Sequence, residues 1–103
     1  MSEFKTNLEK LPSIDNIKSL TLKNDLGETV TVIENKPGKS GSLAVYHHLY
    51  KIYGKIGSEA ANEGLVLFGE YTQEAKNAEG SHPNIDLLFK IINNDLNYTA
   101  VLE

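Results

Sequence analysis

Three short segments of alternating apolar and polar residues limit the fold more than any other feature of this chain. Two of them, residues 17–23 and 28–34, are separated only by Asn24-Asp25-Leu26-Gly27, and the third covers residues 96–102. Such alternation is typical of strands that bury one face. Because a two-stranded hairpin is not stable alone, we expect the last segment to return and pair with the first two.

The segment between the first two strands has the signature of a tight turn. Asn and Asp favour a type I turn, and Gly27 can adopt the left-handed conformation that closes a hairpin with a bulge. Leu20 and Leu22 share one face of the first strand, and Val30 and Val32 share one face of the second. We expect these four side chains to point into the core.

Helical spacing accounts for most of the remaining chain. Phe4, Leu8 and Leu11 recur at i, i+4 and i+7, which predicts a short helix that Ser2 caps and Pro12 ends. Three more helices are expected between the second and third strands. The first runs from Ser40 or Ser42, either of which is its expected cap, to Gly54; the second from Ser58, its expected cap, to Gly80; and the third from Pro83 to Asn93-Asn94.

The predicted order is therefore α-β-β-α-α-α-β, in one α+β domain over residues 1–103. We expect a three-stranded, mainly antiparallel sheet, made by the hairpin and the C-terminal strand, with the helices packed on one face. The chain has 103 residues and no cysteine, so its core depends on apolar burial and not on disulfides or thiolate metal sites.

Composition argues against several classes of partner. All ten positive residues are lysines and the net charge is −4, so we expect no nucleic-acid binding, for which arginines and a basic face are typical. No secretory start and no apolar run of membrane-spanning length is present, which favours a cytoplasmic protein without membrane contact.

A glycine-rich loop precedes the helix that starts near residue 40. Gly38-Lys39-Ser40-Gly41-Ser42 resembles a phosphate-binding loop, because glycine backbones, a lysine and a helix N-terminus all favour anions. The P-loop pattern, however, needs a glycine where Ile33 stands. Two interpretations stay open: a plain turn with a serine cap, or a weak anion site that uses Lys39, Ser40 and Ser42.

The histidines suggest no metal or cofactor site, because His47 and His48 diverge on a helix and no paired-ligand spacing exists. His82 begins a His-Pro-Asn-Ile-Asp cluster, in which Asn84 and Asp86 follow at a helix start. One interpretation is structural: His82 or Ser81 caps the helix and Asp86 complements its dipole. The other is that His48, His82, Asn84 and Asp86 orient a ligand or transfer protons, provided that they converge.

Three of the five tyrosines, Tyr46, Tyr50 and Tyr53, form a second stripe beside the apolar stripe of one helix. Tyrosine suits interfaces, so this edge is a candidate surface for a second copy or another protein; the alternative is a border of the core. Gly69 lies inside the helix predicted over residues 58–79. It has no explanation beyond a kink or the approach of a ligand to the backbone.

Residues 37–46 (Pro-Gly-Lys-Ser-Gly-Ser-Leu-Ala-Val-Tyr), 63–70 (Glu-Gly-Leu-Val-Leu-Phe-Gly-Glu) and 82–86 (His-Pro-Asn-Ile-Asp) resemble a small uncharacterised bacterial family. The resemblance implies a bacterial source and a compact stand-alone domain, and it transfers no catalytic residue. The first functional hypothesis is a non-enzymatic binding or interaction module that self-associates or binds an unknown protein. The alternative is a protein, or a weak enzyme, that binds a small anionic ligand at residues 37–42 and at the His82–Asp86 helix start.

Overall fold

Eight helices and strands follow one another in residues 3–103, the part of the chain that this computed structural model describes. They are α1 (Phe4–Glu9), β1 (Ser19–Lys23), β2 (Thr29–Glu34), α2 (Ser40–Tyr53), α3 (Ser58–Leu67), α4 (Glu70–Asn77), α5 (Pro83–Asn94) and β3 (Thr99–Leu102).

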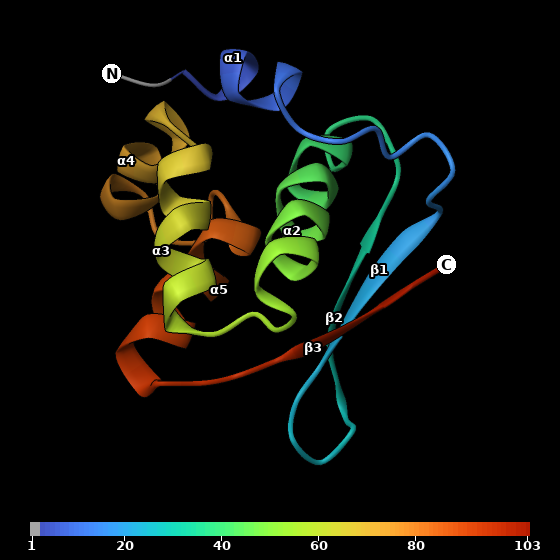
Figure 1. Cartoon of the computed structure of the whole chain (residues 1–103). Helices are drawn as coiled ribbons and strands as arrows, with labels where there is room; N and C mark the ends of the chain where they lie inside the picture. The colour runs from blue at the N-terminus through green and yellow to red at the C-terminus, as the bar shows by residue number, and fades with distance from the viewer. Residues whose placement is uncertain (1–2) are drawn as a thin grey trace.

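The three strands form one antiparallel sheet in the order β2-β1-β3, so the last strand does return to the hairpin as predicted. The helices lie on one side of it, with α2 next to the sheet and α3, α4 and α5 beyond α2 (Figure 1). The predicted α+β class is confirmed. Helix α2 lies between the sheet and α5, so the sheet and α5 are on opposite sides of α2 (Figure 1).

The hairpin turn forms as its residues predict. The side-chain Oδ1 of Asn24 accepts hydrogen bonds from the backbone N–H groups of Leu26 and Glu28, both at 3.0 Å. Gly27 has a φ of 78° and donates its N–H to the carbonyl of Asn24. The pairing register then shifts between Leu22 and Lys23, which is the expected bulge.

The inner face of β2 differs from the prediction. Leu20 pairs with Ile33 and is fully buried with it, whereas Val32 pairs with Thr21 and is 49% exposed. The prediction that Val32 points into the core is therefore wrong, and Val30 is only partly buried. Both faces of this strand carry β-branched residues, so alternation alone left its orientation ambiguous, and the turn and bulge set the register instead.

The single helix predicted over residues 58–79 is two helices. Phe68 ends α3, and Gly69, with φ 57° and ψ −125°, redirects the chain before α4 begins. Side chains avoid this backbone conformation, so Gly69 is explained by the break. Gly64, inside α3, allows close packing: a Cβ at this position would lie 2.8 Å from Cδ1 of Leu88 and 3.0 Å from Cδ1 of Leu49.

Several helix ends also differ from the predictions. Gly54 caps α2 in a left-handed conformation and Pro83 occupies the first turn of α5, as expected. Ser40 and Ser58, however, are the first residues of their helices, and no side chain caps either helix. Ser42 lies within α2 and also fails to cap it. The proposed cap Ser2 lies outside the described residues.

Asn7 fastens α1 to the helical layer. Its Nδ2 donates to the carbonyl oxygens of Leu67, at 3.0 Å, and Val66, at 3.4 Å, where α3 ends. Asn7 is the buried polar side chain in the part of the chain that is described, at 9% exposure. The Val66 carbonyl also accepts the Gly69 N–H at 3.1 Å, so the Asn7 amide adds to the bonding of the last turn of α3 as a cap supplied by another helix.

Candidate functional site

A cleft lies where the glycine-rich loop, the start of α5 and strand β2 approach one another. Its volume is about 710 Å³, within the range of small-molecule sites. Residues 38–42, 81–85 and 31–33 line it, together with side chains from α1, the end of α3 and α4. The two segments selected from the sequence, the loop before α2 and the cluster at His82, therefore meet in one place.

The first turn of α2 opens into this cleft without a cap. Ser40 donates its N–H to the carbonyl of Lys36, and Leu43 donates to that of Lys39. No hydrogen bond within residues 3–103 occupies the N–H groups of Gly41 and Ser42, and both residues line the cleft. With no acidic residue in this turn, the helix dipole leaves positive charge here, next to the Lys39 side chain.

The first turn of α5 forms part of the opposite wall. His82, Pro83 and Asn84 line the cleft, with His82 at the N-cap position. Nε2 of His82 lies 3.6 Å from a carboxylate oxygen of Glu74 on α4. The carboxylate of Asp86 accepts the Gly80 N–H at 2.9 Å, and this residue does not line the cleft.

Aromatic rings from four parts of the chain form the apolar wall of the cleft. The Phe4 ring stacks on Phe68 with centroids 5.3 Å apart and meets Tyr71 edge-on at 5.4 Å. The Tyr71 ring continues to that of His82, at 5.3 Å. Phe4 is held in addition by its N–H, which donates to Glu70 at 2.7 Å. This wall places flat apolar surface beside the polar loop.

Gly41 is required where the aromatic wall meets the loop. A Cβ at this position would stand 2.9 Å from Cζ of Phe4 and 3.0 Å from its Cε2. The absence of a side chain therefore lets the Phe4 ring approach the first turn of α2 closely. This role adds to the exposure of the Gly41 N–H and explains a glycine inside a helix, where it is otherwise unfavourable.

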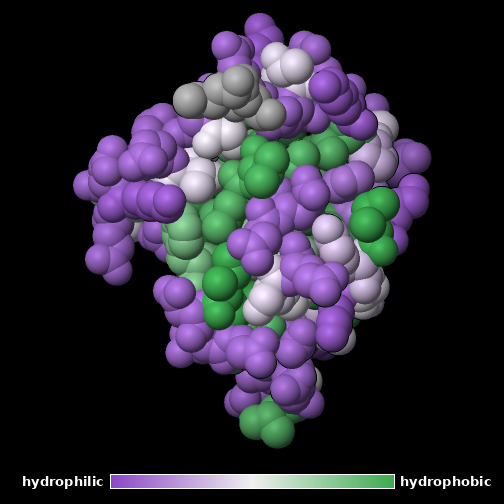
Figure 2. All heavy atoms as spheres, turned by 60° about the vertical axis from the view of Figure 1, so that its left-hand side comes forward, coloured by the Kyte–Doolittle hydropathy of each residue, from purple (hydrophilic) through white to green (hydrophobic). Residues whose placement is uncertain are grey.

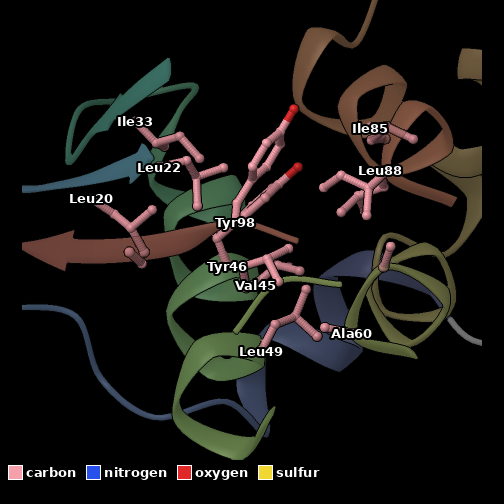
Figure 3. Packing of buried hydrophobic residues seen from close by; sticks show 14 of the residues in the cluster. Leu20, Leu22, Ile33, Val45, Tyr46, Leu49, Ala60, Ile85, Leu88 and Tyr98 are labelled. Atoms are coloured by element: carbon pink, nitrogen blue, oxygen red, sulfur yellow. The ribbon is translucent and has the colours of Figure 1, made fainter. Parts of the chain in front are cut away.

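Tyr46 connects α2 to the start of α5 beneath the cleft. It is fully buried, and its hydroxyl donates to the carbonyl oxygen of Asn84 at 2.5 Å. Its ring lies beside that of Tyr98, and both hydroxyls point in the same direction (Figure 3). Burial, with a smaller effect from Tyr98, raises the pKa of Tyr46 above its ordinary value, so its hydroxyl stays a donor.

The predicted tyrosine surface changes as a result. Tyr46 is a core residue and cannot contribute to an interface. Tyr50 and Tyr53 are half-buried against the core. Next to them Ile52 is 62% exposed. Self-association through Tyr50 and Tyr53 stays a prediction.

Nearly the whole chain matches one known protein family. The family described as "Uncharacterized protein conserved in bacteria (DUF2322)" matches residues 4–102. The chain belongs to this family. No curated protein and no solved structure gave a match. The matched range includes every segment that lines the cleft, so the cleft lies within the family's domain.

For this member of the family, the candidate site residues divide into two groups. Lys39, Ser40, Ser42, His82 and Asn84 line the cleft, whereas His48 and Asp86 do not. His48 is half-buried on α2, and its Nδ1 has no hydrogen-bond partner among the described residues. His48 therefore does not share the cleft with His82, and their convergence was the condition for a role of the two histidines in proton transfer.

Sequence reasoning missed the aromatic wall and the contribution of β2. Phe4, Phe68 and Tyr71 come from three helical segments, and only their packing shows that they form one surface. Gly41, inside α2, and Gly69, between α3 and α4, were the available signals, since both glycines lie beside residues of this wall.

Two further results concern metal sites and membrane-spanning helices. No group of three or more metal-ligating side chains exists among residues 3–103. None of the described helices is long and apolar enough to cross a membrane. Apolar side chains do reach the surface in a band on the helical side, between hydrophilic flanks (Figure 2), and Val66 is 58% exposed.

Proposed function

We propose that the protein is a non-enzymatic binding module that holds an anionic ligand in the cleft between the first turns of α2 and α5. The observation that carries this proposal is the uncapped N-terminus of α2, whose Gly41 and Ser42 N–H groups open into a cleft beside Lys39. Backbone donors, a helix dipole and a lysine all favour carboxylate or phosphate groups.

Charge supports the sign of the ligand. Lys39 is the one lysine that lines the cleft within residues 3–103, and no Asp or Glu lines it there. The nearby Glu34 carboxylate is paired with Lys36 at 3.0 Å, and the charge of Lys39 acts on it as well. The hydrogen bond and charge of Lys36 lower the pKa of Glu34, which keeps that pair ionised.

Binding is favoured over catalysis because His82, the histidine that lines the cleft, is not hydrogen-bonded to a serine nucleophile among the described residues. Acid–base catalysis needs a proton donor or acceptor within hydrogen-bond reach of a reacting group. In the described residues, neither Ser40 nor Ser42 has a side-chain hydrogen bond to His82, and His48 and Asp86 lie outside the cleft. The residues present can hold and orient an anion with an apolar portion against the aromatic wall.

The test is an NMR titration of the ¹⁵N-labelled protein with inorganic phosphate and with succinate. We expect shifts of the Gly41 and Ser42 amides, and about tenfold weaker binding in Lys39→Met, because a charge-assisted contact contributes about 1.5–3 kcal/mol. Lys51→Met, at the other end of α2 and outside the cleft lining, is the matched control and should bind as the wild type does. Unmoved amides in the first turn of α2, or equal losses in both variants, would contradict the proposal.

A further inference from the structure

Strand β2 contributes three consecutive residues, Thr31, Val32 and Ile33, to the lining of the cleft. Successive side chains of a strand point to opposite faces of the sheet. Ile33 is buried on the inner face and Val32 is 49% exposed on the outer face. A cleft that touches all three residues therefore runs along the backbone edge of β2, and not only over one face of the sheet.

This edge carries unpaired backbone groups. β2 lies at the end of the sheet order β2-β1-β3, so only β1 pairs with it. Asn35 donates its N–H to the carbonyl of Lys18 at 2.8 Å. This bond determines which alternate residues of β2 direct their backbone groups toward β1 and which direct them outward. Ile33 therefore exchanges hydrogen bonds with Leu20, whereas the N–H and C=O of Val32 point outward, away from β1.

Glu34 continues the same edge. Its carbonyl oxygen already accepts the Lys36 N–H at 3.0 Å, so its N–H is the outward donor that remains. Within residues 3–103, no hydrogen bond is made to the outward groups of Val32 or to the Glu34 N–H. The free edge thus offers two donors, the N–H groups of Val32 and Glu34, and one acceptor, the Val32 C=O. These groups are spaced as a neighbouring strand would need them.

Residues 29–33 of this edge lack two of the usual protections against pairing, proline and lysine. Residues 29–33 are all β-branched, with no proline and no lysine among them. An exposed edge of this kind is a template on which another chain can pair. Here the edge lies in a cleft whose opposite wall includes Phe68, Tyr71 and His82. A chain that pairs with this edge would therefore lie between β2 and the aromatic wall, in a cleft of about 710 Å³.

We propose that the ligand of this cleft is an extended peptide that adds to β2 as a fourth strand, parallel to it, with its C-terminal carboxylate at the first turn of α2. The proposal rests on the proposed function, because the carboxylate would be the anion held by Lys39 and the Gly41 and Ser42 N–H groups. β2 runs toward the loop that precedes α2, so a parallel strand also ends there.

The remaining contacts follow from the same geometry. Strand addition uses main-chain hydrogen bonds for affinity and pockets for alternate side chains for selectivity. The peptide backbone would pair with Val32 and Glu34, and alternate apolar side chains would face Phe68 and Tyr71. Three residues of β2 span about 10 Å, which corresponds to a peptide of about three to five residues.

The experiment uses two peptides, acetyl-Leu-Thr-Val-Ser-Leu with a free C-terminal carboxylate, in which apolar side chains alternate, and the same peptide as its C-terminal amide. We expect the free acid to shift the amides of Val32, Glu34, Gly41 and Ser42 and to slow hydrogen exchange at the Val32 amide at least about tenfold. The amidated peptide should bind about tenfold more weakly, since it lacks the charged group that the helix N-terminus favours.

Val32→Pro tests the edge directly. Proline is tolerated on an edge strand where its missing N–H faces outward, and it removes the donor that the peptide needs. The control is Leu102→Pro, which changes the opposite edge, on β3, and should leave binding intact. Thermal unfolding checks that both variants fold, and the exchange rate of the Val32 amide in the wild type gives the answer without either of them.

The outcomes separate the two proposals. Shifts of Gly41 and Ser42 with phosphate or succinate, but no protection of Val32 by either peptide, would overturn strand addition and leave the anion site standing. The absence of shifts with every probe would overturn both. Protection of the Val32 amide that rises with protein concentration and needs no peptide would identify a second copy as the occupant, and would also overturn the peptide proposal.

Discussion

The backbone at Gly69 allows a stringent test of how the helical layer is built. This residue adopts φ 57° and ψ −125° between α3 and α4. An L-residue in so sparsely populated a region costs about 1–3 kcal/mol. Replacing glycine also restricts the unfolded chain, which raises the free energy of unfolding by about 0.4–1 kcal/mol. We therefore expect Gly69→Ala to lower the free energy of unfolding by about 1–2 kcal/mol.

The matched control is D-alanine at the same position. Reversing the signs of both angles gives an extended conformation that an L-residue adopts freely, so a D-residue fits where an L-residue is strained. Because the chain has no cysteine, the protein can be assembled by ligation at an alanine followed by desulfurisation. The D-alanine protein should be at least as stable as the wild type, since only the restriction of the unfolded chain remains.

Urea unfolding followed by far-UV circular dichroism measures both differences. For a domain of this size, the L-alanine variant should also melt about 5–10 °C lower. Phe68 and Tyr71 flank Gly69, so the same variant should weaken ligand binding in the cleft. Equal stabilities for the L-alanine and wild-type proteins, or equal losses for the L- and D-alanine proteins, would refute the explanation from backbone conformation.

Two other predictions concern α2. Burial, followed by the charges of Lys51 and His48, lowers the pKa of His47 from its ordinary value of 6.5. Below pH 6.5 the unfolded chain therefore binds a proton at this histidine more readily than the folded protein does. Stability should therefore fall as the pH drops from 6.5 through the lowered pKa, and His47→Gln should reduce the difference between urea unfolding at pH 7.5 and pH 5.5; an unchanged difference would count against this role. If Tyr50 and Tyr53 form a self-association surface, sedimentation at high micromolar concentration should show a dimer that Tyr50→Ala weakens at least about tenfold, because central interface tyrosines contribute about 2 kcal/mol or more. A monomeric wild type would remove that hypothesis.

The architecture was largely predictable because its signals are local. The turn at Asn24 and Gly27, the alternation at Leu20 and Leu22 and the position of Pro83 each depend on a few neighbouring residues. The return of β3 followed from the instability of a lone hairpin. In contrast, the face of β2 could not be assigned, since Val32 and Ile33 are equally suited to a strand interior and only the register decides between them.

The site was predictable only in part, for a related reason. The loop at Lys39 and the cluster at His82 have compositions that favour ligands, and the structure brings them together. The aromatic wall could not be found in this way, because Phe4, Phe68 and Tyr71 resemble ordinary core residues in the sequence. The uncapped start of α2 was also missed, since Ser40 and Ser42 are typical caps and only the backbone shows that neither acts as one.

The attachment of α1 bears on how this protein is prepared for study. Phe4 belongs to the cleft wall, its N–H is bound by Glu70, and Asn7 joins the helix to the end of α3. An affinity tag fused ahead of Phe4 therefore begins at the rim of the candidate site, and a deletion through Asn7 would remove one side of it. A tag placed after β3 avoids both problems, so binding data from N-terminally and C-terminally tagged protein should be compared before any negative result is accepted.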